Sequence, residues 1–405
     1  MRVFATVRYA QGKLFTCKRA FFIMLTLNQK HLKIVFFAGA ALAMAAMIWF
    51  GLSTDVNIGR NPLPGSAFPR GRVIGMLDNQ ALTAENAFRS GQQVLLVEIL
   101  TGEHRGKVAE VRNIVFIDAM VNPRIGQTLV IHFDYHGNGN YSAHVHSYVR
   151  ETAIYVIVAL FLVLIAVVGG KAGISSAFGL VFTFVTLLFL LTPAIMRGGP
   201  PAFLTIAVSL LITTVSLTAI MGFEKKTWVG IAGTSVGIVF YCLFYVIISA
   251  ALSVSGANIP EMNQLAGLGF TDTLHLTELL FCGILIASLG AVTDTTVSVA
   301  SATAELGATG ANLGFRDLFK SSMRMARDCI GSSANTLILA FTGTFFVTLI
   351  MFRLHELNYT MLINRIDIAI EVLRAISASA GMILCAPATA LLGSYAYRYK
   401  AKKRA

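Results

Sequence analysis

The sequence predicts a polytopic α-helical integral membrane protein with about eight transmembrane helices and a small β-domain between the first and second of them. Hydrophobic residues make up 56% of the 405 residues and charged residues only 13%, with a mean hydropathy of +0.71. Eight apolar runs lie close to the ~20 residues that an α-helix needs to cross a bilayer. One internal stretch, residues 53–150, has no such run and instead alternates apolar with polar residues.

The first apolar run, residues 34–52, predicts a transmembrane helix after a basic cytoplasmic segment at residues 1–33. No clear small-x-small cleavage site lies beside this run, so we expect an uncleaved helix, with translation starting at the first residue or at Met24. Residues 151–396 form a seven-helix membrane domain, and residues 397–405 form a basic cytoplasmic tail. The seven runs are residues 153–169, 173–192, 202–221, 228–252, 276–292, 336–351 and 370–395.

Residues 53–150 predict a small extracytoplasmic β-barrel or β-sandwich. Their short alternating segments are separated by turn-rich sequences such as TGEHRG and HGNGN, a pattern typical of strands joined by tight turns. The five expected strands are residues 72–76, 93–100, 107–113, 128–135 and 142–149.

Basic residues predict the orientation in the bilayer. The basic chain ends and the short loops at Lys171, Lys225 and Arg316 fall on one side, which the positive-inside rule assigns to the cytoplasm. We therefore expect a bacterial cytoplasmic (inner) membrane protein with both termini inside and residues 53–150 outside. The net charge of +12 lies mainly in these loops and chain ends, so the lipid bilayer is the expected partner and nucleic acid is not.

A stripe of small and polar residues marks one side of the expected helix around Asp294. Because an ionisable group that faces lipid is costly, we expect this stripe to pack inside a helix bundle, with Asp294 as a coupling carboxylate. The alternative is that Asp294 ends its span at the cytoplasmic interface and caps a following helix. The stripe comprises Gly283, Ala287, Gly290, Asp294, Ser298, Ser301 and Glu305, and the transport or coupling candidates are Asp294, Thr293, Thr295, Ser298, Ser301 and Asn335.

Two further charged groups have competing interpretations. The basic amphipathic stretch at residues 315–328 predicts either a helix on the membrane surface or a cytoplasmic gate in which Arg327 or Asp328 meets the Asp294 region. In the last span, Glu371 and Arg374 are three residues apart, which predicts a structural ion pair within the helix.

Four of the eight histidines lie within the sequence IHFDYHGNGNYSAHVH. Strand alternation places His132 and Asp134 on one face of one strand, and His144 and His146 on one face of the next. A register that opposes residue 134 to 144 and residue 132 to 146 would bring the four side chains together as ligands for zinc or a similar metal. The alternative is a solvated hairpin whose histidines do not meet, and no other cofactor is expected.

Several motifs resemble the YibE/YibF family of multi-pass membrane proteins. They include GRVIGM, VEILTGEHRGK and TPAIMRGGPP, and above all LGAVTDTTVSVASATAEL and RDCIGSSANTLILA. The segment SSMRMARDCIGSS departs from the usual pattern of the family. The resemblance implies the multi-pass topology, and a permease role is the common interpretation for its members.

The sequence contains no HExxH, no Walker loop, no nucleophile elbow and no GxGxxG between a strand and a helix, so we do not expect an enzyme. We expect an ion- or proton-coupled transporter (permease) of a small solute or ion. The alternative is a non-transporting membrane scaffold, or a partner of an export or envelope system, that uses the β-domain for docking. Either function is compatible with a homo-oligomer or with an envelope protein as partner.

Overall fold

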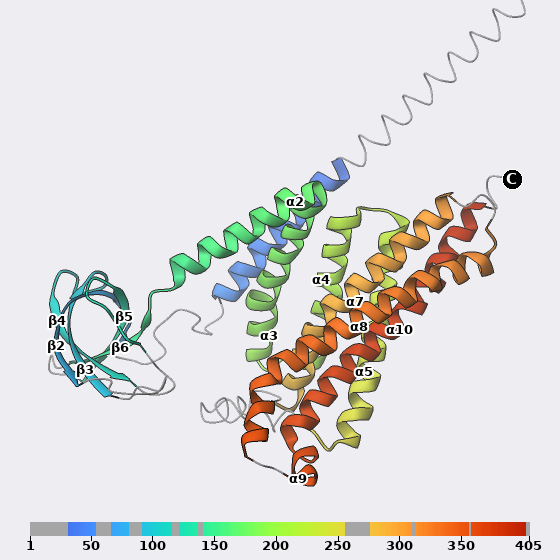
Figure 1. Cartoon of the computed structure of the whole chain (residues 1–405). Helices are drawn as coiled ribbons and strands as arrows, with labels where there is room; N and C mark the ends of the chain where they lie inside the picture. Colours follow the sequence, from blue (N-terminus) through green and yellow to red (C-terminus); the bar gives the residue numbers. More distant parts are fainter. Residues whose placement is uncertain are drawn as a thin grey trace, which may run out of the picture. The chain divides into compact units, whose positions relative to one another are not determined.

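The computed structural model of this chain forms two compact units (Figure 1). One unit is Asn57–Val167, and the other combines Met1–Val56 with Val168–Ala405. The predicted basic segment before residue 31 and the last four residues of the predicted tail lie outside the described residues. The structure describes residues 31–53, 66–80, 91–115, 121–136, 141–255, 276–309, 313–355 and 358–401.

Five strands of the first unit form a closed β-barrel. The sheet order is β1-β5-β2-β3-β4-β6, and an additional pairing of β5 with β6 closes it. All the pairings are antiparallel except that of β4 with β6, which gives the strand connectivity of an OB-fold. The five predicted strands are confirmed, and they form a barrel. The strands are β1 (Ser66–Ala67), β2 (Arg70–Gln80), β3 (Gly91–Ile99), β4 (Val108–Val115), β5 (Thr128–Tyr135) and β6 (Tyr141–Tyr148).

Every second residue of the strands points into the barrel and fills its interior. Along β5, Leu129, Ile131 and Phe133 point inward and are fully buried, whereas the residues between them are partly exposed. One polar pair lies inside, where the Asn113 Nδ2 atom donates a hydrogen bond of 2.7 Å to Gln93 Oε1. This hydrogen bond offsets the cost of burying the two amide groups in the barrel core.

Seven helices of the described chain are long and apolar enough to cross a membrane, by length and composition. This result supports a polytopic membrane protein, as predicted. The short helix α9 (Tyr359–Ile363) is additional to them. The seven are His31–Ser53, Glu151–Met196, α4 (Pro201–Met221), α5 (Lys225–Ala251), α7 (Leu276–Thr309), α8 (Phe315–Leu354) and α10 (Ile366–Ala401).

The longest apolar stretch, Glu151–Met196, is interrupted at Gly170. It consists of α2 (Glu151–Thr186), the π-helical turn η1 (Leu187–Leu191) and α3 (Thr192–Met196). Gly170 has φ 55° and ψ −132°, a conformation that glycine adopts without the penalty of a Cβ atom. A straight helix of this length would extend about 69 Å, more than twice the ~30 Å hydrocarbon thickness of a bilayer. The interruption instead separates the two apolar runs that the sequence predicts here.

Helices α7 and α8 continue far beyond the predicted spans. The sequence predicts spans at residues 276–292 and 336–351, but α7 runs to Thr309 and α8 begins at Phe315. The stretch at residues 315–328 is helical as expected, and it is continuous with the following span because it forms the first part of α8. Helix α8 contains no proline, and its glycines weaken a helix without ending it.

Small residues bring α5, α7 and α10 into close contact. Gly233 and Gly237 of α5 are four residues apart, the small-xxx-small spacing that lets helix backbones approach. A Cβ atom at Gly237 would lie 2.8 Å from the Val292 Cγ1 atom of α7 and 2.9 Å from the Cys385 Cβ atom of α10. A Cβ atom at Gly381 of α10 would lie 2.9 Å from the Gly237 carbonyl oxygen. The contact therefore leaves no room for a larger side chain.

The substitution Gly381→Ala tests this contact. Because the new methyl group would meet backbone atoms of α5, we expect the free energy of unfolding to fall by about 1–3 kcal/mol. The matched control is Gly343→Ala on α8, where an added Cβ atom meets nothing within 4 Å. The control should keep or raise the thermal unfolding temperature in detergent, because alanine favours a helix. Equal unfolding temperatures for the two variants would contradict the close contact.

Candidate functional site

Asp294 lies inside α7 and does not cap a helix. The helix starts at Leu276 and ends at Thr309, so Asp294 is near its middle and has helical neighbours on both sides. A capping residue stands at a helix end, where backbone N–H groups are free. The interpretation of Asp294 as a helix cap is therefore wrong.

The stripe of α7 faces outward from the described bundle, contrary to the prediction. Asp294 and Ser298 are exposed, whereas Leu285, Val292 and Val299 on the opposite side are buried. The helix contacts α4, α5, α8 and α10. The aliphatic face packs inward because it buries more apolar surface. Within the described residues, Asp294 forms no hydrogen bond and no ion pair.

The other α7 candidates offer few free polar groups. The Thr293 hydroxyl donates to the Leu289 carbonyl oxygen at 2.7 Å, and the Thr295 hydroxyl donates to the Ala291 carbonyl oxygen at 2.9 Å. Ser301 is half-buried. The hydroxyls of Thr293 and Thr295 are therefore already bonded within their own helix.

The predicted gate residues do not meet Asp294. Arg327 and Asp328 are exposed on α8, and neither forms an ion pair with another described residue. The inward side of this part of α8 is lined by small residues such as Ser322 and Ala326. Asn335, further along α8, is also exposed.

The predicted ion pair of the last span is confirmed. Arg374 Nη1 lies 3.2 Å from Glu371 Oε2, and the Arg374 guanidinium also lies over the Phe341 ring. Asp367, one turn earlier, pairs instead with Arg365 at 2.7 Å. These contacts stabilise the start of α10 and leave the two basic groups paired.

The predicted register of the histidine hairpin is wrong. Strand β5 opposes His132 to His144 and Asp134 to Ser142, two residues away from the predicted pairing. The ladder continues to the last residues of β5 and the first of β6, so the connection between the strands is shorter than the prediction assumed.

The histidines pack against an aromatic side chain instead of converging on a metal. The His132 ring stacks on Phe68 with centroids 4.5 Å apart, and its Nε2 atom lies 3.1 Å from Asp134 Oδ1. The His146 ring meets Phe68 edge-on at 5.2 Å. In the part of the chain that the structure describes, no group of three or more His, Cys, Asp or Glu side chains is placed to hold a metal ion. The predicted zinc site formed by His132, Asp134, His144 and His146 is thus not present in this arrangement.

A site that the sequence analysis missed begins at Glu278, in the first turn of α7. The Glu278 Oε2 atom accepts a hydrogen bond of 3.0 Å from the Ala202 backbone N–H of α4. The free N–H groups and the dipole of a helix N-terminus favour a carboxylate there. Glu278 thereby links the beginnings of two helices of the bundle.

A line of buried hydroxyls follows along α4. Thr205, Ser209 and Thr213 are spaced four residues apart, so they share one face, and each is at most 1% exposed. Thr205 lies against the Cys282 thiol, a weak hydrogen-bonding partner on α7. We call Glu278, Thr205, Ser209 and Thr213 the polar row.

The hydroxyls of Ser209 and Thr213 have no hydrogen-bond partner among the described residues. Elsewhere in the bundle, several buried hydroxyls bond a carbonyl of their own helix, as those of Thr186, Thr303 and Thr389 do, while Ser322 of α8 and Ser377, Ser379 and Ser394 of α10 are single buried serines without a partner among the described residues. A buried polar group without a partner costs about 1–3 kcal/mol. The polar row is therefore suited to a polar guest such as water, a proton carrier or a small ion. The i, i+4, i+8 spacing of hydroxyls in TIAVSLLIT is a sequence signal that could have identified it.

Comparison with known proteins identifies one family. A family model described as YibE/F-like protein matches residues 157–399, the larger part of the chain. No curated protein and no solved structure matches significantly.

A pair of identical substitutions tests whether the polar row is unsatisfied. Thr213→Val removes a hydroxyl without a partner, so we expect the free energy of unfolding to stay unchanged or to rise by up to about 2 kcal/mol. Thr296→Val removes a hydroxyl that lies 2.9 Å from the Thr234 hydroxyl of α5, so we expect a loss of about 1 kcal/mol. Thermal unfolding in detergent measures both. A larger loss in Thr213→Val than in Thr296→Val would contradict the assignment.

Proposed function

The chain belongs to the YibE/F-like protein family, and from its polar row we propose that it is an ion- or proton-coupled membrane transporter. The observation that carries the proposal is the buried line of hydroxyls on α4 that starts at the Glu278 carboxylate. Carriers use buried carboxylates and polar groups at helix ends to bind coupling ions. The substrate is a small solute or ion.

The length of the polar row fits a binding site that reaches the middle of a bilayer. From Ala202, which Glu278 contacts, to Thr213 the helix rises about 16 Å, roughly half of the ~30 Å hydrocarbon core. Beyond it, the closely packed α5, α7 and α10 close the interior, and Thr234 and Thr296 bond each other there. We interpret the structure as an occluded state, in which the hydroxyls of the polar row extend inward from the level of Glu278 but are closed to solvent.

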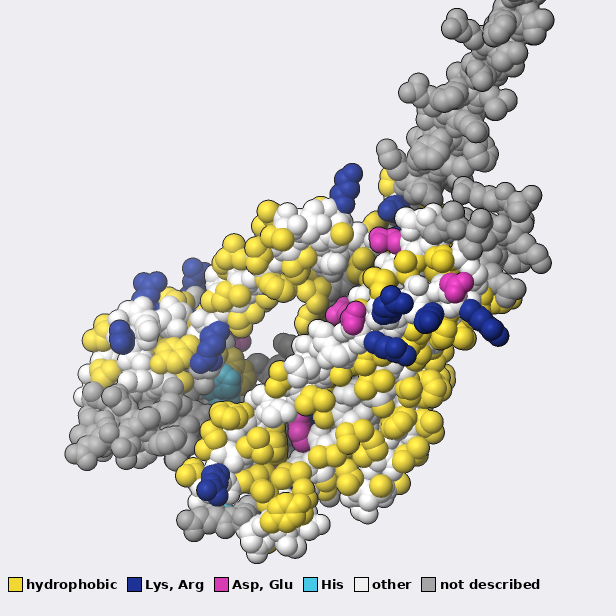
Figure 2. All heavy atoms as spheres, turned by 45° about the vertical axis from the view of Figure 1, so that its right-hand side comes forward, with side chains coloured by type: hydrophobic (Ala, Val, Ile, Leu, Met, Phe, Trp, Pro, Cys, Tyr) yellow, Lys and Arg dark blue, Asp and Glu magenta, His cyan; other side chains and the backbone are white. Residues whose placement is uncertain are grey.

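The distribution of charge supports an orientation of the polar row relative to the two sides of the membrane. Lys33 lies beside Gly222 in the α4–α5 connection, and Lys226 pairs with Glu224 in the same region. Figure 2 shows Lys and Arg side chains gathered near one end of the helices, over a flank that is mostly hydrophobic. We assign this basic end to the cytoplasmic side of a bacterial inner membrane. The chain then crosses the membrane eight times, with residues 151–169 and 171–196 counted as separate crossings. The Glu278 end and the β-barrel are then extracytoplasmic.

A scaffold remains the second candidate function, because one observation favours it. The α7 stripe of Gly283, Gly290, Asp294 and Ser298 is uncovered, and a Cβ atom added at either glycine would meet no other atom within 4 Å. Small residues on an uncovered face allow another helix to pack closely, and a partner would relieve the cost of an unpaired carboxylate in lipid. A second copy or an envelope protein would cover this face.

Substrate flux through proteoliposomes tests the transport proposal. Glu278→Gln keeps an oxygen that accepts the Ala202 hydrogen bond but removes the charge, so we expect coupled flux to fall at least about tenfold. The matched control is Glu305→Gln, at an exposed position near the end of the same helix, which should keep normal flux. A panel of cations and small solutes identifies the coupled species. Normal flux in Glu278→Gln together with its loss in Asp294→Asn would transfer the coupling role to Asp294.

Cysteine labelling in intact cells tests the orientation. In a background without the five native cysteines, Arg353→Cys at the end of α8 should react with a membrane-impermeant maleimide. Glu224→Cys at the basic end should react only after the cells are permeabilised. The reverse pattern would invert the assignment, and equal labelling of both sites would exclude a membrane between them.

A further inference from the structure

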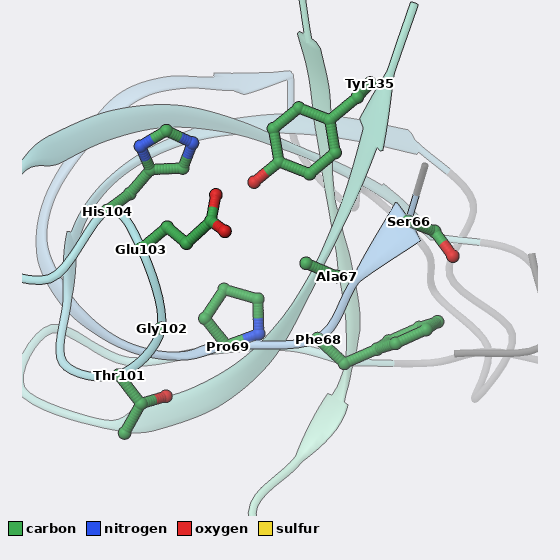
Figure 3. Close-up of a pocket in the computed structure, with 9 residues that line it drawn as sticks. All are labelled: Ser66, Ala67, Phe68, Pro69, Thr101, Gly102, Glu103, His104 and Tyr135. Carbon is green, nitrogen blue, oxygen red and sulfur yellow. The ribbon is translucent and has the colours of Figure 1, made fainter. Parts of the chain in front are cut away.

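The β-barrel has a pocket of about 510 Å³ at the end where β3 turns into β4. Three separate segments of the chain line it: the β1 region, the β3–β4 loop and the end of β5 (Figure 3). Its volume is in the range of small-molecule sites in proteins. The side chains that matter for binding are Ala67, Pro69, Thr101, Glu103, His104 and Tyr135.

Hydrogen bonds hold the backbone of the β3–β4 loop around Glu103. Gly102 and Gly106 on either side of it have φ values of 83° and 82°, which glycine adopts without strain. Within the loop, the Gly106 N–H donates to the Ile99 carbonyl oxygen at 2.8 Å. The Thr101 hydroxyl accepts a hydrogen bond from the backbone N–H of Arg70, which ties the loop to the segment after β1. The loop side of the pocket is therefore held by hydrogen bonds, and the end of β5 forms the opposite side.

The pocket combines one free negative charge with aromatic walls. Glu103 forms no ion pair and no hydrogen bond with any described residue, and its carboxylate faces the Tyr135 hydroxyl across the pocket (Figure 3). The His104 ring lies 5.9 Å from the Tyr135 ring and 5.7 Å from the Tyr141 ring, so the three form one aromatic cluster. Burial, followed by the nearby charges of Glu103 and Tyr141, raises the pKa of Tyr135.

We propose that this pocket binds a small organic cation with a primary ammonium group. The Glu103 carboxylate pairs with the ammonium, the Tyr135 hydroxyl accepts one of its hydrogen bonds, and the Tyr135 ring contributes a cation–π contact. The carbon chain of the ligand lies along Ala67 and Pro69. An anion would meet the unpaired Glu103 charge, and among the described residues no metal-binding group occurs.

This inference is independent of the transport proposal, because every residue it uses lies within the barrel unit. It would hold for a carrier, in which the barrel would concentrate a cationic substrate, and equally for a scaffold that senses amines. Failure of the flux experiment would leave it unaffected.

Calorimetry on the full-length protein in detergent tests the proposal with putrescine, a diamine, and with 1,4-butanediol, its uncharged analogue. We expect putrescine to bind and the diol to bind at least about tenfold more weakly. Glu103→Gln should weaken putrescine binding by about tenfold or more, and Tyr135→Phe by a smaller factor. The matched control Glu110→Gln, at an exposed position on β4, should bind as the wild type does.

Two further measurements make the result decisive. Unfolding temperatures check that Glu103→Gln and Glu110→Gln are equally folded. Putrescine should also lower the pKa of the Tyr135 phenol, observed by NMR of labelled tyrosine and assigned with Tyr135→Phe, because a bound cation favours the phenolate. Equal binding of the diol, unchanged affinity in Glu103→Gln, or no putrescine binding at millimolar concentration would each overturn the proposal.

Discussion

The close approach of α5 and α10 is the contact on which the rest of the helical unit depends. Small residues recur every four positions on α10, at Ser377, Gly381, Cys385 and Thr389, and the last three lie against Gly233 and Gly237 of α5. A bilayer supplies little hydrophobic drive between helices, so close packing of this kind has to hold them together. Because α7 packs into the same contact through Val292, this packing also fixes which face of α7 is buried.

Residues with a strict local period could be predicted from the sequence. Alternation with a period of two predicts all five barrel strands, since inward residues such as Leu129 and Phe133 differ sharply from their neighbours. Long apolar runs likewise predict where the helices lie. Their ends were less predictable, because the polar part of α7 after Asp294 is held helical by its neighbours and not by its hydropathy. The hairpin register depended on the length of one connection, which composition does not determine.

The residue pattern of α7 predicts that the helix has two different faces, but it does not determine which face turns toward the bundle. The α7 stripe around Asp294 is present as predicted, but the prediction that it faces inward rested on the cost of a charge in lipid alone. The opposite face, with Leu285 and Val292, buries more apolar surface against four helices, and that term decides the orientation. The cost of exposing Asp294 then remains and has to be met by water or by another protein. The uncovered stripe is consequently a surface on which another protein could pack in an assembly.

The buried hydroxyls of the bundle fall into two groups, those with a hydrogen-bond partner among the described residues and those without one. Around the α5–α10 contact, Thr234, Thr296 and Thr389 are bonded, whereas Ser377 of α10 is buried without a partner among the described residues. Along α4, Ser209 and Thr213 are buried without partners among the described residues, at about 1–3 kcal/mol each. Proteins are stable by only about 5–15 kcal/mol, so a sequence selected for stability alone would replace these hydroxyls with alanine or valine. Their alignment along one helix face that starts beside a carboxylate is best explained by a polar guest that satisfies them for part of a functional cycle.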